Sequence, residues 1–564
     1  MLVKNIFKGI LFFLAAFICA YGLFSVLKDD EATDEYKDAY IKSDEVTAKA
    51  YSLDFSTSIE IVRGTKVTTT YEKVSIEDTN LKYYEINYQN NVYLILPEYI
   101  TKEENDVVGE TKAFVRTPVS VYEDSNSSHL ISFIPKGSEV EILGYDYLND
   151  DGTVNKYKVR YNGIDGYIYE KYTVNILDEA IKNYDHNGSY EVHVARKNPY
   201  GGGSAANLDY FPVEKSTFEN NVMPDEVKSL YLNSSAIKNV DEYIELAKNA
   251  GINAFVVDIK DNTAPAYKSE VMKKYSPTNY TKAFWTVETY RTTIQKLKDN
   301  GFYVIGRITT FKDNYYAKDH PEDTIMDNRT NSSFLHNGSY WPSAYSRDVW
   351  EFNVELAKEA VTLMGFNEIQ FDYVRFPDRT SDVEEYLNYQ NQYGEEKAQA
   401  IQNFLFYACD EIHSVGAYVS ADVFGESAHD YVAGYGQYWG AISNVVDVIS
   451  GMPYPELFNK YEYGFSKPVW TVPYELLYHW GSKYVMKQQS LVPTPAIVRT
   501  WIQAYDITWR DPNTSYDAAK VEAQIQGLYD AGLTGGFITW NSVSSLSKYE
   551  QLSPAFSKNY LGSD

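Results

Sequence analysis

The sequence is poor in cysteine and has no excess of positive charge. Two cysteines, Cys19 and Cys409, occur among 564 residues, which excludes a disulfide framework and a cysteine-based zinc site. Lysine and arginine number 51 against 78 aspartate and glutamate residues, so the formal net charge is −27 at pH 7. Because binding to nucleic acid needs a basic surface, we expect no nucleic-acid partner. The hydrophobic content of 44% excludes a disordered or collagen-like chain.

Sequence motifs for metal ions and nucleotides are also absent. The chain contains no H-x-H or H-E-x-x-H motif, and His336 and His429 lie in polar segments without the spacing of metal ligands. No glycine-rich nucleotide fingerprint follows the first strand predicted in the C-terminal region. We therefore expect neither a catalytic metal nor a cofactor.

One long uncharged hydrophobic run occurs, at residues 9–27, and no second run of that length follows it. In a helix such a run spans roughly 28 Å, close to the thickness of a hydrocarbon core. Lysines at positions 4 and 8 precede the run and acidic residues 29–31 follow it, so the N-terminus is expected in the cytoplasm and the bulk of the chain outside. We therefore expect residues 1–28 to form a single-pass signal anchor. The alternative is a cleaved signal peptide, which would make the protein secreted.

The region that follows contains an internal repeat. Short β-type runs broken by glycine, asparagine and aspartate extend from about residue 48 to residue 174, without a helical period. The segment RGTKV at 63–67 matches KGSEV at 136–140, and YEINY at 84–88 matches YKVRY at 157–161, both 73 residues further along. A constant offset indicates two copies of one unit. We expect two small all-β modules, at 48–105 and 106–175, after an acidic linker at 29–47 and before a connector at 176–225.

The second copy resembles a bacterial SH3-like domain. The resemblance rests on RTPVSVY at 116–122, PKG at 135–137, VRYNG at 159–163 and GYI at 166–168. The first copy is degenerate and lacks the closing GYI. Such modules often bind cell-wall peptides, so the resemblance implies peptidoglycan as a partner. The alternative is a spacer that binds nothing.

Beyond residue 223, helical stretches end in glycine and are followed directly by apolar, β-rich runs. This alternation is typical of a parallel sheet that is buried on both faces. The predicted strands are 229–232, 255–260, 303–307, 369–372, 418–422, 446–450, 497–502 and 537–540. Eight such strands predict an α/β fold of the TIM, or (β/α)₈, barrel type at 226–552, with a C-terminal tail at 553–564. A doubly wound open sheet is the alternative.

Charged and aromatic residues gather at the C-terminal ends of these strands, where barrel enzymes carry their active sites. A carboxylate inside an apolar strand costs desolvation unless it is paired or used. The candidates are Asp258, Lys260, Arg307, Asp372, Arg375, Asp422, Glu426, Tyr454, Gln503 and Trp540.

Paired carboxylates beside aromatic side chains are what glycoside hydrolysis requires. Asp372 and Asp422 end neighbouring strands, whose spacing of about 4.8 Å makes the separation of a retaining pair feasible. Asp258, two strands from Asp372, would instead form a wider, inverting pair with it. No lysine or arginine lies between residues 398 and 459, which suits Asp422 as proton donor. Arg307 and Arg375 would keep Asp372 ionised as the nucleophile.

Structural roles explain part of the same pattern. Asp258 would serve as one half of a barrel ion pair with Lys260 or Arg307. Arg375, in the sequence RFP, would fix a loop by donating to backbone carbonyls. Asp372 and Asp422 would likewise be structural residues in a barrel without activity.

The C-terminal region also resembles a bacterial family of predicted glycoside hydrolases that was formerly a domain of unknown function. The resemblance rests on IQFDYVRFP at 369–377 and SADVFG at 420–425, and extends over about residues 227–552. This family is distantly similar to the α-amylase and α-galactosidase barrels, which implies that Asp372, at the end of strand 4, is the nucleophile. In such enzymes the acid lies on strand 5 or 6. Strand 6 ends without a carboxylate, which points to Asp422, with Glu426 as a substitute.

The sequence thus predicts a membrane-anchored extracellular glycoside hydrolase that cleaves a cell-wall or environmental polysaccharide. Asp372 and Asp422 would be catalytic, whereas Lys260, Arg307, Arg375 and Tyr454 would orient the sugar and Trp540 would stack on it. The further candidates for substrate binding are Asp258, Glu426 and Gln503. Two alternatives remain: a catalytically silent carbohydrate- or peptidoglycan-binding surface protein, and a transglycosylase that uses the same site.

Overall fold

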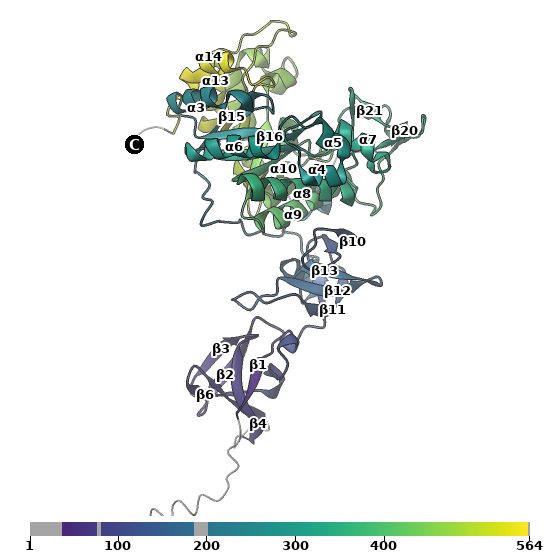
Figure 1. Ribbon diagram of the computed structural model, residues 1–564, viewed down its shortest axis with the longest axis vertical. Coiled ribbons are helices and arrows are strands. Elements are labelled where there is room, and N and C mark those ends of the chain that lie inside the picture. Colours follow the sequence, from purple (N-terminus) through teal and green to yellow (C-terminus); the bar gives the residue numbers. More distant parts are fainter. Residues whose placement is uncertain (1–35, 76–80, 185–200, 562–564) are drawn as a thin grey trace, which may run out of the picture. The chain divides into compact units, whose positions relative to one another are not determined.

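The structure is a computed structural model that describes residues 36–75, 81–184 and 201–561 (Figure 1). The hydrophobic run at 9–27, predicted to be a membrane anchor, lies outside the described residues. Within the described ranges, no helix has both the length and the apolar character needed to cross a bilayer.

The chain divides into two compact units. Unit 1 comprises the residues up to Ala113, together with 140–160 and 169–171, and unit 2 comprises 114–139, 161–168 and 172 onward.

Unit 1 contains an antiparallel sheet with the order β3-β2-β6-β5-β4-β1-β7. Its strands are β1 (Lys37–Ile41), β2 (Thr47–Ser52), β3 (Ser58–Val62), β4 (Lys66–Ser75), β5 (Lys82–Tyr88), β6 (Asn91–Ile95) and β7 (Ile100–Thr101). Alternate residues face the core, as Ala39 and Ile41 do on β1, which explains the period-2 pattern of the sequence. β1 lies inside the span predicted to be an acidic linker, so the all-β region begins earlier than residue 48.

The second copy of the repeat is divided between the units. The hairpin of β11 (Glu139–Tyr145) and β12 (Lys156–Tyr161) pairs within unit 1. In unit 2, β9 (Val119–Tyr122) pairs antiparallel with β10 (Leu130–Ile134) and with β13 (Ile164–Tyr169). The all-β character predicted for the N-terminal region is therefore confirmed, whereas its SH3-like type stays a prediction.

The rest of unit 2 is built around a nearly closed parallel sheet. Its strands, in sheet order from β15, are β15 (Val227–Leu232), β16 (Ala254–Asp261), β18 (Tyr303–Thr309), β23 (Glu368–Asp372), β25 (Tyr418–Phe424), β26 (Val448–Met452), β27 (Ile497–Val498), β28 (Thr500–Gln503) and β29 (Gly536–Trp540). The seventh strand is split at Arg499: β27 pairs with β26, and β28 pairs with β29, which returns to β15. The α/β class with a barrel-like parallel sheet is thus confirmed, and the predicted strands lie within about two residues of those observed.

Helices follow the strands and cover the sheet (Figure 1). They include α3 (Val240–Asn249), α6 (Val287–Asp299), α8 (Arg347–Met364), α9 (Lys397–His413), α10 (Trp439–Val445), α11 (Pro473–Trp480), α13 (Ala518–Asp530) and α14 (Leu546–Phe556). The apolar face of α8 carries Val354 and Val361, both buried. α8 ends because Gly365 adopts a φ of 72°, and its N–H donates to the Val361 carbonyl at 2.8 Å.

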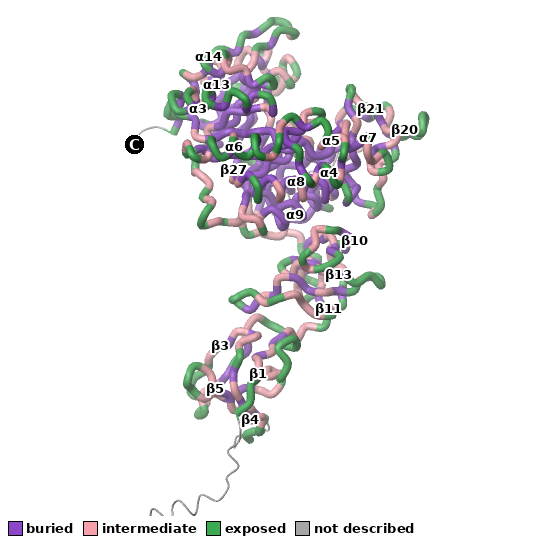
Figure 2. Tube along the Cα trace, viewed as in Figure 1, coloured by how far each residue is buried: buried purple, intermediate pink, exposed green. Residues whose placement is uncertain are grey.

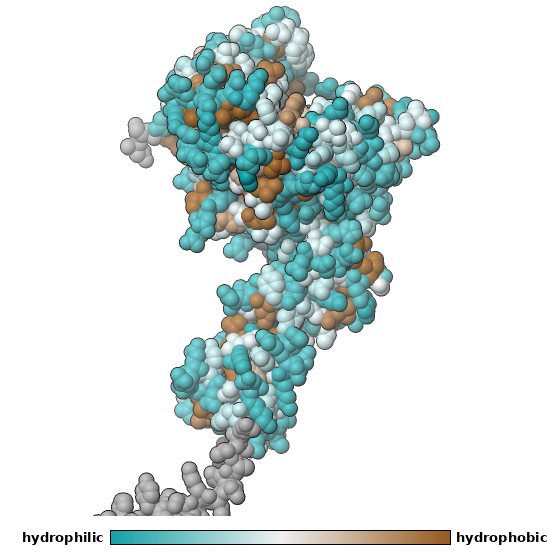
Figure 3. Space-filling model, viewed as in Figure 1, coloured by the Kyte–Doolittle hydropathy of each residue, from teal (hydrophilic) through white to brown (hydrophobic). Residues whose placement is uncertain are grey.

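The strands of the barrel are mostly buried (Figure 2), and apolar side chains such as Val256 and Ile305 form a buried cluster among them. Polar side chains also meet inside the barrel at several levels. At the N-terminal end of the strands, the Arg499 guanidinium donates to both oxygens of Glu368 at 2.9 Å, and the Tyr303 hydroxyl donates to the same carboxylate. Above this pair, the Gln370 amide donates to Ser450 Oγ at 3.2 Å. The exterior seen in Figure 3 is mainly hydrophilic, with small separate groups of hydrophobic residues.

Candidate active site

Four ionisable side chains lie near one another at the C-terminal edge of the sheet. Asp258, Arg307, Asp372 and Asp422 come from β16, β18, β23 and β25, which are consecutive in the sheet. Asp258 lies opposite Arg307 in the register, and the residues just before Asp372 and Asp422 lie opposite one another. Since side chains alternate between the two faces of a strand, these four all face the barrel interior.

Arg307 joins two of the carboxylates. Its Nη1 donates to Asp258 Oδ1 at 2.6 Å, whereas Nη2 and Nε donate to Asp372 Oδ2 at 2.6 and 3.1 Å. The Arg307 side chain is 2% exposed, so these charge-assisted bonds lie away from water. The structure therefore brings together three of the residues predicted from strand ends.

Asp258 is almost completely buried, with 1% of its surface exposed. Its Oδ2 accepts a hydrogen bond from the Tyr231 hydroxyl at 2.6 Å. Burial raises the pKa of Asp258 to about 6, and Arg307, which favours the charged form, offsets only part of this effect. The structural role considered for Asp258, an ion pair with Arg307, is the arrangement observed.

Asp372 is the most accessible of the three carboxylates, with 7% of its surface exposed. Its Oδ1 accepts from the Tyr373 N–H at 2.6 Å, so both carboxylate oxygens are held in place. Tyr373 itself adopts a φ of 49°, a left-handed conformation that is uncommon for a non-glycine residue and costs backbone strain. Such strain is characteristic of functional sites.

Asp422 is fully buried, with an exposure of 0%. Its Oδ1 accepts from the Trp501 indole N–H at 2.7 Å, and its Oδ2 has no hydrogen-bond partner. Burial, followed by the nearby charge of Asp372, raises the pKa of Asp422 well above its usual value and favours the protonated form.

A cavity of about 210 Å³ opens above these residues. We call it the inner cavity. It is lined by Arg307, Asp372, Tyr373, Arg375, Phe424, Met452, Tyr454, Glu456, Leu457, Trp501, Tyr505 and Trp540. The rings of Tyr454 and Trp540 lie nearly parallel in its wall, with centroids 6.5 Å apart. The inner cavity thus combines an ionic pair with flat aromatic surfaces, as many small-molecule sites do.

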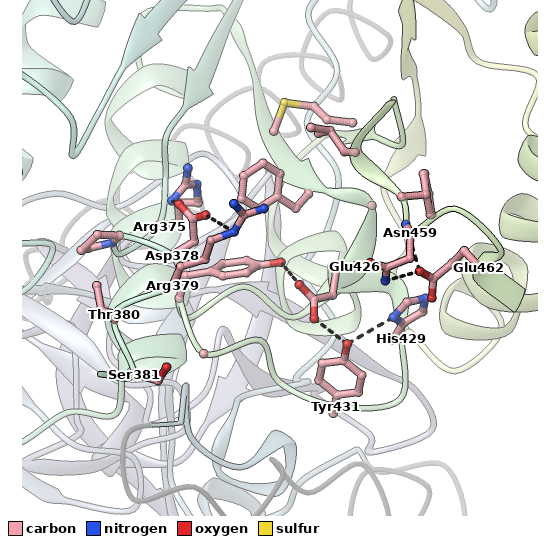
Figure 4. A pocket seen from close by; sticks show the side chains of 18 of the residues that line it. Arg375, Asp378, Arg379, Thr380, Ser381, Glu426, His429, Tyr431, Asn459 and Glu462 are labelled. Carbon is pink, nitrogen blue, oxygen red and sulfur yellow. Dashed lines mark hydrogen bonds and ion pairs between the residues drawn. The ribbon is translucent and has the colours of Figure 1, made fainter. Parts of the chain in front are cut away.

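A larger hollow of about 720 Å³, the outer cleft, adjoins the inner cavity. The two share the lining residues Arg375, Phe424, Met452 and Leu457. Figure 4 shows the outer cleft, with Arg375 and Asp378 on one side and Glu426, His429 and Tyr431 on the other. The shared lining makes the two spaces parts of one site.

Arg375 and Glu426 both belong to the outer cleft. Arg375 donates to the Phe376 carbonyl at 2.9 Å and to Asp378 Oδ1 at 3.1 Å, so it fixes its own loop while lining both spaces. Glu426 accepts hydrogen bonds from the hydroxyls of Tyr431 at 2.6 Å and Tyr435 at 3.2 Å (Figure 4).

Three of the predicted substrate-binding residues, Asp258, Lys260 and Gln503, line neither space. The register of β16 shifts between Asp258 and Lys260, so Lys260 faces away from the barrel interior. On the outer side of the strand, its ammonium donates to Asp313 at 2.8 Å. The Gln503 amide oxygen accepts from the Glu456 N–H at 3.2 Å, which makes it a support for the loop after β26.

Strand-end reasoning missed Tyr231, Glu456, Trp501 and Tyr505. Tyr231 and Trp501 lie on the predicted strands 1 and 7 and face inward by the same alternation, so a period-2 reading could have found them. Glu456 lies four residues beyond the end of β26, and Tyr505 lies beyond β28, where no sequence signal marks them.

One group of side chains in the described part of the chain could supply three ligands to a metal ion. It consists of His320, Glu322 and Asp323. None of these residues lines the inner cavity or the outer cleft.

Comparison with known proteins gives one family and several solved structures. A hypothetical protein from Ruminiclostridium thermocellum ATCC 27405 is 32% identical, over 34% of this chain and 97% of that one, with a TM-score of 0.30. The glycoside hydrolase domain of PgaB (BpsB) from Bordetella bronchiseptica is 12% identical, over 59% of this chain and 99% of that one (TM-score 0.42). The β-galactosidase of Rahnella sp. R3 is 13% identical, over 61% of this chain and 57% of that one (TM-score 0.41).

No curated protein matches the chain. The family match covers residues 229–546, more than half of the chain and nearly all of the barrel. It therefore includes every carboxylate described above. The chain belongs to the family described as "Putative glycosyl hydrolase domain".

Proposed function

We propose that this protein is a glycoside hydrolase whose nucleophile is Asp372. The observation that carries the proposal is the placement of that carboxylate: it lies at the end of β23, is held by Arg307, and lines the inner cavity. Membership of the glycosyl hydrolase family supports the reaction class. A fixed carboxylate at the wall of an aromatic cavity is suited to stabilise an oxocarbenium-like transition state.

In the retaining form of the reaction, Asp372 attacks the anomeric carbon while the bond to the leaving group breaks. Water then releases the sugar from the covalent intermediate. Arg307 positions Asp372 through two hydrogen bonds, and its second contact, with Asp258, fixes the guanidinium in turn. Tyr454 and Trp540 offer flat surfaces to the sugar ring.

Asp422, predicted as the acid, remains part of the proposed machinery. Its raised pKa supports a protonated carboxyl beside Asp372, which leaves Asp372 as the charged member of the pair. Trp501, rather than Asp422, lines the inner cavity. Asp422 therefore acts by leaving the charge on Asp372, and it acts less directly on the substrate.

The substrate is proposed to be a polysaccharide. The outer cleft has more than three times the volume of the inner cavity and continues it through four shared residues. A polysaccharide whose cleaved sugar unit occupies the inner cavity thus has room for further sugar units in the outer cleft. Arg375 and Glu426 offer polar groups along this path.

We also propose that residues 9–27 anchor the protein in the cell membrane, with the barrel outside the cell. The SH3-like modules would then hold the enzyme near peptidoglycan. To test whether the SH3-like modules bind peptidoglycan, binding of the intact chain to purified peptidoglycan sacculi is compared with binding of a chain that lacks residues 48–175. Equal binding by both would contradict it.

Hydrolysis itself is tested with the full chain on a panel of polysaccharides and aryl glycosides, by reducing-end release. Asp372→Asn should lower turnover by roughly 10³-fold or more. Asp299→Asn, at the exposed end of α6, is the matched control and should leave turnover unchanged. Binding of a glycan without turnover by the wild type would instead favour a silent carbohydrate-binding protein.

A further inference from the structure

We propose that Glu456 is the general acid/base of this site, a role that rests on the proposed glycoside hydrolase function. Three observations lead to it: the cavity that Glu456 shares with Asp372, the way its carboxylate is held, and the burial of Asp422.

Glu456 and Asp372 line the same inner cavity but come from different strands. Asp372 ends β23, whereas Glu456 lies in the loop after β26, and β25 separates those two strands in the sheet. A sugar in the inner cavity is thus within reach of both side chains, from two parts of the wall. Glycoside hydrolysis requires two carboxyl groups that flank the scissile bond, and residues from two parts of one wall can supply them.

The Glu456 carboxylate is fixed although it is only partly buried. Oε1 accepts from the Tyr505 hydroxyl at 2.6 Å, and Oε2 accepts from the Trp509 indole N–H at 3.1 Å. The backbone of Glu456 is held as well, since its N–H donates to Gln503 and its carbonyl accepts from Arg510. All four partners belong to the segment at 503–510, so the loop after β26 is fixed by the loop after β28. One donor to each oxygen leaves the carboxylate further capacity to exchange a proton with a substrate.

Asp422 lacks the access that proton transfer to a substrate needs. It is 0% exposed, and Trp501, which donates to its carboxyl group, forms part of the wall of the inner cavity. A general acid must come within hydrogen-bond distance of the glycosidic oxygen. Glu456, unlike Asp422, lines the inner cavity itself.

The proton balance follows from these positions. In the first step, protonated Glu456 gives its proton to the glycosidic oxygen as the bond to the anomeric carbon breaks, and Asp372 forms the new bond to that carbon. In the second step, the Glu456 carboxylate takes a proton from water, whose oxygen attacks the anomeric carbon and releases Asp372. Glu456 ends the cycle protonated and Asp372 ends it ionised.

The test compares Glu456→Ala and Glu456→Gln with Asp422→Asn on aryl glycosides that differ in leaving group. Glu475→Gln, on the exposed side of α11, is the matched control. For a poor leaving group, both Glu456 variants should lose roughly 10²- to 10⁴-fold in kcat/KM, whereas a dinitrophenolate leaving group, which needs no proton, should be released almost normally. Azide should restore turnover of Glu456→Ala and yield a glycosyl azide. A merely structural role would give neither the leaving-group dependence nor the rescue.

Several outcomes would overturn the proposal. If both Glu456 variants match Glu475→Gln on the poor leaving group while Asp372→Asn is inactive, Glu456 is not the acid/base although the enzyme is a hydrolase. If Asp422→Asn alone shows the leaving-group dependence and the azide rescue, Asp422 has the role. If the wild type cleaves no glycoside of the panel, the proposed function fails and this proposal fails with it. The midpoint of thermal unfolding of the isosteric Glu456→Gln variant is compared with that of the wild type, and an equal midpoint shows that the fold of the variant is intact.

Discussion

Replacing Asp258 with asparagine should change how the stability of the barrel depends on pH. Asp258 is 1% exposed, and burial raises its pKa from 3.8 to about 6 despite the Arg307 guanidinium. A carboxyl whose pKa is higher in the folded state stabilises the fold below about pH 4, where it is protonated in both states. That stabilisation is lost as the pH rises through 6.

The size of the effect follows from the two pKa values. Each pKa unit corresponds to 1.36 kcal/mol, so the charged Asp258 costs the native state about 3 kcal/mol by pH 7.5. Asparagine imitates the protonated carboxyl and carries no charge at either pH. The free energy of unfolding of Asp258→Asn minus that of the wild type should therefore rise by about 2 kcal/mol between pH 4 and pH 7.5, because part of the full effect is already present at pH 4.

Urea unfolding followed by tryptophan emission measures this difference. All nine tryptophans lie between residues 285 and 540, so their emission reports on the barrel and not on the β modules. Asp422 and the other titrating groups are common to both proteins and cancel in the difference. A difference that stays constant with pH would refute the reasoning. A difference that falls with rising pH would show that Arg307 outweighs burial.

Three other substitutions have distinct expected outcomes. Trp501→Phe removes the donor to Asp422 and should lower the free energy of unfolding by about 1–3 kcal/mol, measured by chemical denaturation with circular dichroism. Lys260→Met breaks a fully buried ion pair with Asp313 and should cost about 3–5 kcal/mol of stability while kcat per folded molecule stays unchanged. Glu426→Gln, in the outer cleft, should lower kcat/KM for long glycans and leave that for aryl monosaccharides unchanged. An equal loss on both substrates would contradict the extended cleft.

The parallel strands of the barrel could be predicted because each is a short apolar run with a helix before or after it. The repeated pattern of a helix, a glycine and a strand placed all eight within about two residues of the observed strands. It also located Arg307 and Asp372, whose side chains face inward by simple alternation. The sequence pattern gave no indication that the seventh strand divides at Arg499.

Side-chain directions and loop paths could not be predicted in the same way. A register shift in β16 turns Lys260 outward, and such a shift depends on the neighbouring strand rather than on local composition. Glu456 reaches the inner cavity because two loops far apart in the sequence bind one another. The indole that donates to Asp422 belongs to Trp501, which lies 79 residues further along the chain.

The most direct test of the central claim is to trap the sugar on the enzyme. The full chain is incubated with a panel of 2-deoxy-2-fluoroglycosyl fluorides, which slow the release of a covalent intermediate, and its peptides are analysed by mass spectrometry. We expect one added sugar, attached to Asp372 in the peptide that contains residues 369–375. A sugar attached to another carboxylate, or undiminished hydrolysis by Asp372→Asn, would contradict the assignment of Asp372 as the nucleophile.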